Sequence, residues 1–192
     1  MKNIKLLGIV GVALVACSCS SSNVAVKQTE TESSSLRASN SEERLALEIH
    51  NEVNRYRTGK GLSSLKFHAG LGRMSKKHSD YMRDNAGSFS VDGRLISHYG
   101  FDGRRTLADR KYRIESLSEN VIASFDMGQG TDLAAKMVRG WLNSPNHKAN
   151  LDSKWEQTGI GVSFDKEGRA FVTQTFGSDP SQVLTVGGPS QW

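Results

Sequence analysis

Hydrophobic residues recur with helical spacing in three stretches of the chain. Residues 42–57 and 71–85 place apolar side chains every three or four positions, as an amphipathic helix does. The clearest pattern covers residues 131–142, where two adjacent helical rows are apolar: Leu133, Met137 and Trp141 in one, and Ala134, Val138 and Leu142 in the next. The pattern therefore predicts three helices, each with one buried face.

Residues 119–124 are predicted to form a strand, and polar and apolar residues alternate in two later stretches, residues 159–164 and 169–176. A period of two is typical of a strand with one buried face, and turn residues at 166–168 join the last two stretches into a predicted hairpin. Helix, helix, strand, helix, strand, strand is the order of an α+β domain.

The third predicted helix is followed by a proline and a histidine. The residue before a proline is disfavoured in the α conformation, so we expect this helix to end near Ser144, just before Pro145. His147 is then expected on a turn after a well-anchored helix, where its side chain can face a cleft. Taken alone, the same position also fits a surface or turn-capping histidine.

The N-terminus has the pattern of a bacterial lipoprotein leader. A short basic start precedes an apolar run over residues 6–16, which is too short to cross a bilayer and is typical of a signal peptide. Leu14-Val-Ala-Cys17 looks like a lipobox, so we predict cleavage after residue 16 and lipidation of Cys17, which would attach the chain to a membrane. Ordinary cleavage that releases a secreted protein is the alternative.

Composition divides the remaining chain into three parts. Residues 17–40 are rich in Ser and Thr and are expected to be a flexible tether, residues 41–178 carry the predicted fold, and residues 179–192 form a short tail. The only cysteines are Cys17 and Cys19, so the domain has no disulfide and a cysteine-protease mechanism is excluded. Loss of Lys2 and Lys5 with the leader lowers the net charge from +5 to +3, which does not call for a nucleic-acid partner.

Six short motifs, taken together, resemble the CAP (SCP-like) superfamily of cysteine-rich secretory, antigen 5 and pathogenesis-related proteins, in its bacterial branch. They occur in the family's order: residues 50–55, Ile96-Ser-His98, Ser118-Glu-Asn-Val121, Trp141–Leu151, Thr158-Gly-Ile-Gly-Val162 and Phe171–Gly177. The resemblance covers residues 41–178. It implies a three-layer α–β–α sandwich, which agrees with the α+β order.

The resemblance also implies a central cleft lined by His98, Glu119 and His147. Two imidazoles and one carboxylate suit Zn²⁺ or another divalent metal with an open position for water. Without a metal, the same groups would form a hydrogen-bonded network or the polar end of a ligand pocket. The basic segment Arg104–Arg113 is expected to be a short helix that rims this cleft, either as a solvated face or as a site for anionic headgroups or polymers.

The sequence departs from the family pattern at two positions. Ser144 stands where many eukaryotic members have a second glutamate, and Ser118 stands where the family has glycine before Glu-Asn. The first change removes a carboxylate that could act as a general base. The histidines at 50, 68 and 78 are expected to be satisfied structural residues and not ligands.

Three functions fit these observations, and the missing glutamate favours the first. It is a non-enzymatic extracytoplasmic module of the cell envelope that binds a lipid, an envelope polymer or a protein. The second is a metal-assisted hydrolase or peptidase, with His98, Glu119 and His147 as catalytic candidates. The third is an adhesion or structural lipoprotein.

Overall fold

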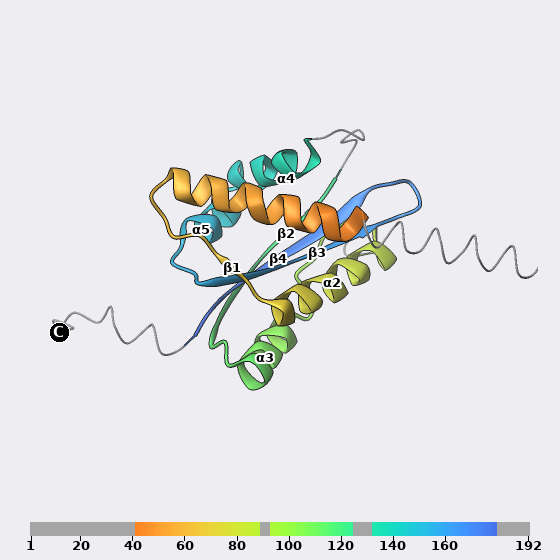
Figure 1. The fold of residues 1–192 in the computed structure, drawn as a ribbon. Helices are drawn as coiled ribbons and strands as arrows, with labels where there is room; N and C mark the ends of the chain where they lie inside the picture. Colours follow the sequence, from red (N-terminus) through yellow and green to blue (C-terminus); the bar gives the residue numbers. More distant parts are fainter. Residues whose placement is uncertain (1–40, 89–92, 125–131, 180–192) are drawn as a thin grey trace, which may run out of the picture. The chain divides into compact units, whose positions relative to one another are not determined.

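A four-stranded mixed sheet lies between two layers of helices (Figure 1). The structure, a computed structural model, describes residues 41–88, 93–124 and 132–179, which fall within one unit spanning Arg37–Trp192. The elements are a first helix over residues 41–59, β1 (Lys66–Phe67), α2 (Ala69–Asp84), α3 (Phe101–Tyr112), β2 (Ser116–Ala123), α4 (Leu133–Leu142), α5 (Pro145–Asp152), β3 (Gln157–Phe164) and β4 (Ala170–Ser178). This α+β sandwich confirms the predicted fold class.

Several predictions concern residues outside the described ranges: the signal peptide 1–16, the lipidation of Cys17, the tether 17–40 and most of the tail 179–192. Within the described ranges, no helix combines the length and the apolar composition needed to cross a membrane.

The strand order of the sheet is β1-β3-β4-β2, with β1 parallel to β3 and the other pairs antiparallel. Among the described residues, β2 therefore pairs with β4 alone and forms one edge of the sheet. Successive side chains of a strand point to opposite faces. Glu119 and Val121 consequently point towards α2, while Asn120 points towards the layer that holds α4 and α5.

Large apolar side chains fill the space between the sheet and the layer of the first helix, α4 and α5. Trp141 is fully buried there, and its indole Nε1 donates a hydrogen bond to the carbonyl of Val121 at 3.2 Å. The main members of this core are Leu45, Ile49, Val53, Met137, Val138, Trp141, Leu151, Ile160, Val162, Val172 and Phe176. The helical rows predicted from the sequence are the ones that face the sheet.

The opposite face is packed by close backbone approach. A Cβ atom added to Gly161 would lie 2.1 Å from the backbone nitrogen of Lys76, so only glycine allows α2 to approach β3 this closely. The hydroxyl of Ser79 donates to the carbonyl of Gly161 at 2.9 Å and is hydrogen-bonded to the hydroxyl of Thr173 at 3.0 Å. Glycine and hydroxyl side chains thus join α2 to the sheet.

The prediction for residues after α4 was wrong in one respect. The helix ends at Leu142 as expected, and Ser144 is extended (φ −104°, ψ 118°). Pro145, however, is the first residue of another helix, α5, because proline fits the first helical position, where no backbone N–H donor is needed. His147 therefore lies in the first turn of α5 and not on a turn between elements.

Candidate functional site

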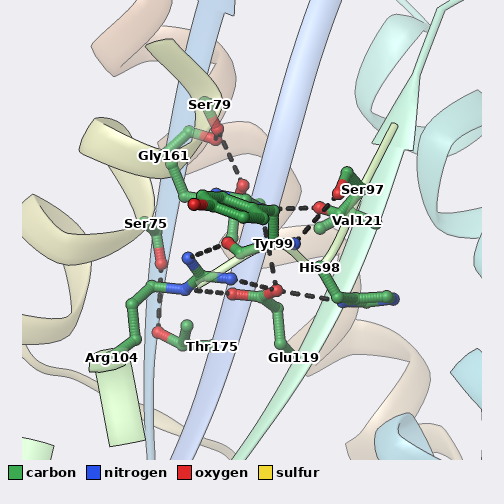
Figure 2. Close-up of polar contacts among 12 residues, drawn as sticks. Ser75, Ser79, Ser97, His98, Tyr99, Arg104, Glu119, Val121, Gly161 and Thr175 are labelled. Atoms are coloured by element: carbon green, nitrogen blue, oxygen red, sulfur yellow. Dashed lines mark hydrogen bonds and ion pairs between the residues drawn. The ribbon is translucent and has the colours of Figure 1, made fainter. Parts of the chain in front are cut away.

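Glu119 lies in the middle of the edge strand β2, and its side chain is only 1% exposed. Its carboxylate accepts hydrogen bonds from Arg104 Nε at 2.8 Å and Arg104 Nη2 at 2.7 Å, one on each oxygen. His98 Nδ1 lies 2.9 Å from Oε1 (Figure 2). A buried carboxylate with this many donors is fixed in position.

Arg104 reaches Glu119 from the first turn of α3. Gly100 precedes the helix with φ 76°, a left-handed conformation that glycine adopts readily, and turns the chain back towards β2. Arg104 Nη1 also donates to the carbonyl of Tyr99 at 2.9 Å, and the side chain is 11% exposed. The basic segment is helical, as predicted, but this role of Arg104 was not predicted.

The hydrogen bond between His98 and Glu119 determines which imidazole nitrogen stays free. A carboxylate that is ionised can only accept, so the hydrogen is assigned to Nδ1 of His98. In the neutral form of the ring, Nε2 then carries the lone pair. Because the His98 side chain is 52% exposed, Nε2 is the nitrogen available to a ligand or a water molecule.

His78 approaches Glu119 from α2. Its Nε2 lies 2.7 Å from the carbonyl of Ser97 and 3.8 Å from Glu119 Oε1, and the side chain is 2% exposed. The prediction of a buried, hydrogen-bonded histidine is confirmed. Its proximity to Glu119 was missed, since a helical pattern shows that a residue is buried but not what it faces.

An aromatic stack continues from His78 to the surface. The His78 ring stacks on Tyr81 with ring centroids 5.9 Å apart, and Tyr81 stacks on Tyr99 at 5.3 Å with an interplanar angle of 17°. Tyr99 is 68% exposed, so the stack ends in an aromatic ring that is open to solvent.

His147 lies near these residues but is not bonded to them. In the described part of the chain, its ring makes no hydrogen bond to Glu119 or His98. Its backbone carbonyl accepts from Asn120 Nδ2 at 3.1 Å, which ties α5 to β2. Burial lowers the pKa of His147, and its proximity to the His98 imidazole lowers that pKa further.

Comparison with known proteins agrees with this architecture. Residues 50–176 match the model of the CAP family, described as the cysteine-rich secretory protein family. The chain belongs to the CAP family. No curated protein sequence matches the chain.

Three solved bacterial structures share this CAP fold. An outer surface protein of Borrelia burgdorferi is similar with a TM-score of 0.55 and 18% sequence identity. The match covers 68% of this chain and 90% of the Borrelia chain. An extracellular SCP-domain protein of Bacillus anthracis has a TM-score of 0.53 at 24% identity, covering 72% of this chain and 41% of its own. A cysteine-rich secretory protein of Staphylococcus aureus has a TM-score of 0.52 at 18% identity, and the match covers 71% of this chain and 38% of the Staphylococcus chain. At these identities the likeness shows the fold alone.

The serine at the family's glycine position joins two elements of this CAP domain. Ser118 Oγ donates to Asn150 Oδ1 at 2.7 Å, and Asn150 Nδ2 donates to Asn120 Oδ1 at 2.8 Å. The departure from the family pattern therefore adds a hydrogen bond between β2 and α5, on the opposite side of β2 from the Glu119 carboxylate.

Opposing effects set the charge of Glu119. Burial alone would raise its pKa, but hydrogen bonds from His98 and Arg104 and the charge of Arg104 outweigh burial and hold the pKa below its usual range. Burial lowers the pKa of His78, although Glu119 opposes the effect. At neutral pH Glu119 is therefore an anion, His78 is neutral and Arg104 is the permanent cation.

The predicted metal ligands do not fit a metal ion in this arrangement. Among the described residues, no three His, Cys, Asp or Glu side chains are grouped so that they could hold one. Both oxygens of Glu119 accept from Arg104, and the His98 nitrogen that faces Glu119 is a donor. A site made of His98, Glu119 and His147 stays a prediction, and it requires that Arg104 leave the carboxylate.

Proposed function

We propose that this CAP domain is an extracytoplasmic module that binds a cell-envelope ligand on the surface formed by Tyr99 and His98. The exposure of Tyr99 carries the proposal. Its backbone nitrogen donates to Ser97 Oγ at 2.9 Å, its carbonyl accepts from Arg104 at 2.9 Å, and its ring rests on Tyr81. An exposed side chain held this firmly loses little entropy when it binds a partner.

The two residues offer complementary contacts. Tyr99 presents an apolar ring face and a phenolic hydroxyl, and His98 presents Nε2 as a hydrogen-bond acceptor. The ligand expected from this surface has a flat or apolar part next to a hydrogen-bond donor. A lipid with a polar headgroup, an envelope polymer and a peptide all have this character.

The leader and the relatives support a location outside the cytoplasm. Lipidation of Cys17 would hold the domain at a membrane through residues 17–40, and two of the related structures are described as extracellular or outer surface proteins. We therefore propose that the chain is a lipoprotein outside the cytoplasm, with secretion of the unlipidated chain as the alternative.

A hydrolase is the second candidate, and the Glu119–His98 pair favours it. A carboxylate that accepts from one imidazole nitrogen orients the other as a general base, here towards solvent. Such an enzyme would activate water at His98 Nε2. In that case His98→Ala would abolish hydrolysis of an envelope substrate while Tyr99→Ala would mainly raise KM.

The test is a titration of the purified protein with three probes: a lysophospholipid below its micellar concentration, a soluble peptidoglycan fragment and an unrelated peptide. We expect one probe to bind without turnover, and Tyr99→Ala to weaken that binding on the order of tenfold. Phe67→Ala is the control, because Phe67 is 56% exposed on β1, at the opposite edge of the sheet. Equal binding by Tyr99→Ala and the wild type would contradict the proposal, and no binding of any probe would favour a structural role.

A further inference from the structure

We infer that Arg104 is the built-in cation of this site and keeps divalent metals off Glu119. The inference does not depend on the ligand proposed above.

The burial of Glu119 creates the need for a cation. A carboxylate that is 1% exposed is costly to keep ionised unless an opposite charge and hydrogen bonds compensate it. A metal ion can provide that charge, and so can a guanidinium group. Here Arg104 forms two parallel hydrogen bonds to the two carboxylate oxygens, at 2.7 and 2.8 Å.

Arg104 is also held so that it cannot leave easily. Its Nη1 donates to the carbonyl of Tyr99 at 2.9 Å, and its guanidinium carbon lies 6.0 Å from the ring centre of Phe101. A guanidinium keeps its charge over the whole pH range in which proteins are folded. A metal would therefore have to displace a permanent cation that makes three hydrogen bonds.

The histidines do not open another route to Glu119. His98 faces the carboxylate with Nδ1–H, and the Nε2 of His78 that lies nearest the carboxylate is bonded to the carbonyl of Ser97, so it carries hydrogen too. Every polar group that faces Glu119 in the described residues is thus a donor. Once Arg104 is removed, Glu119 would be a buried anion beside imidazoles that can change tautomer, and such a group attracts a metal.

The experiment is a calorimetric Zn²⁺ titration of the purified wild-type protein, Arg104→Met and Arg105→Met. Arg105 is the matched control, because it neighbours Arg104 on α3 but its side chain is 60% exposed and pairs with Asp102. We expect no tight site in the wild type or in Arg105→Met, and one equivalent bound by Arg104→Met at least about tenfold more tightly. Adding His98→Ala to Arg104→Met should abolish the new site.

Two results would overturn the inference. The first is a tight one-to-one Zn²⁺ site in the wild type that His98→Ala removes, and the second is the absence of Zn²⁺ binding in both the wild type and Arg104→Met. If Arg104→Met does not fold, as judged by circular dichroism, Arg104→Lys replaces it. Lysine keeps a positive charge but cannot form two parallel hydrogen bonds to a carboxylate, so the Arg104→Lys protein should bind Zn²⁺ more tightly than the wild type. Equal affinities of the two proteins would contradict the inference.

Discussion

The two faces of the sheet are held to their helices by different means. On one face, large side chains such as Trp141 fill the space beneath the first helix, α4 and α5. On the other, Gly161 and Ser79 bring α2 into close contact with β3, and the buried charges of Glu119 and Arg104 lie beside it. The first face holds the larger apolar cluster, whereas the face covered by α2 combines two smaller apolar clusters with glycine contacts, hydroxyl hydrogen bonds and the ion pair of the site.

The largest expected effect concerns the apolar face. Trp141→Ala removes the largest fully buried side chain and its hydrogen bond to Val121, so we expect a loss of about 3–5 kcal/mol in the free energy of unfolding. Urea denaturation measures it. Leu47→Ala, at a position that is 60% exposed on the first helix, is the control and should change stability by less than about 0.5 kcal/mol. Similar losses in both variants would show that this face is not the main core.

The next test concerns the close approach of α2 to the sheet. The new methyl group of Gly161→Ala would meet the α2 backbone, which cannot move aside without breaking other contacts, so we expect a loss of about 3 kcal/mol. Gly59→Ala is the matched control, because nothing lies within 4 Å of its added Cβ. If Gly161→Ala is as stable as Gly59→Ala, the packing of α2 on the sheet is looser than described.

A smaller effect is expected for the hydroxyl groups of the same face. Ser79→Ala deletes the hydrogen bonds to Gly161 and Thr173 inside a buried contact and should cost about 1–2 kcal/mol. Thr106→Ala, which removes an exposed hydroxyl bonded within α3, should have almost no effect. Chemical denaturation of the two variants in parallel separates a buried polar contact from an exposed one, and equal stabilities would argue against polar packing of this face.

The smallest effect is a dependence on pH. Burial lowers the pKa of His78, which faces Glu119, Arg104 and His98, so the unfolded chain takes up a proton at this residue more readily than the folded one. The contribution of neutral His78 to the free energy of unfolding is fully present above the usual histidine pKa. It is lost as the pH falls from that value through the lower pKa of His78 in the folded protein. We expect unfolding free energies to decrease from pH 7.5 to pH 5.5, and to decrease less in His78→Gln. An identical pH dependence in both proteins would contradict this assignment.

Much of the fold could be predicted because it follows from periodicity. The apolar rows of residues 131–142 mark the one buried face of α4. Residues 159–164 and 169–176 were predicted as strands from their alternation, although β3 and β4 are buried on both faces because the sheet has helices on each side. Residues 71–85 were predicted as a helix, and α2 spans Ala69–Asp84 with His68 as its N-cap. The start of α5 was missed because Pro145 disfavours a helical conformation before it but is compatible with one that begins there.

The site was harder to predict because its partners are distant in sequence. The family resemblance predicted that His98 and Glu119 lie close together, and they do. The charge of residues 104–113 did not indicate that Arg104 is the basic residue of this segment that binds Glu119. Tyr99 and His78 were also not assigned to the site. An arginine a few residues after a glycine, as Arg104 stands after Gly100, is too common a pattern to indicate an ion pair.

The central claim is that Arg104 and Glu119 depend on each other inside the fold, and a double-mutant cycle tests it most directly. Denaturation free energies would be measured for the wild type, Arg104→Met, Glu119→Gln and the double variant. Each single change leaves a buried group without its partner, so we expect the double variant to be more stable than the sum of the single losses predicts, by about 1–3 kcal/mol. Additive losses would contradict the account, because they would mean that Glu119 is stabilised without Arg104.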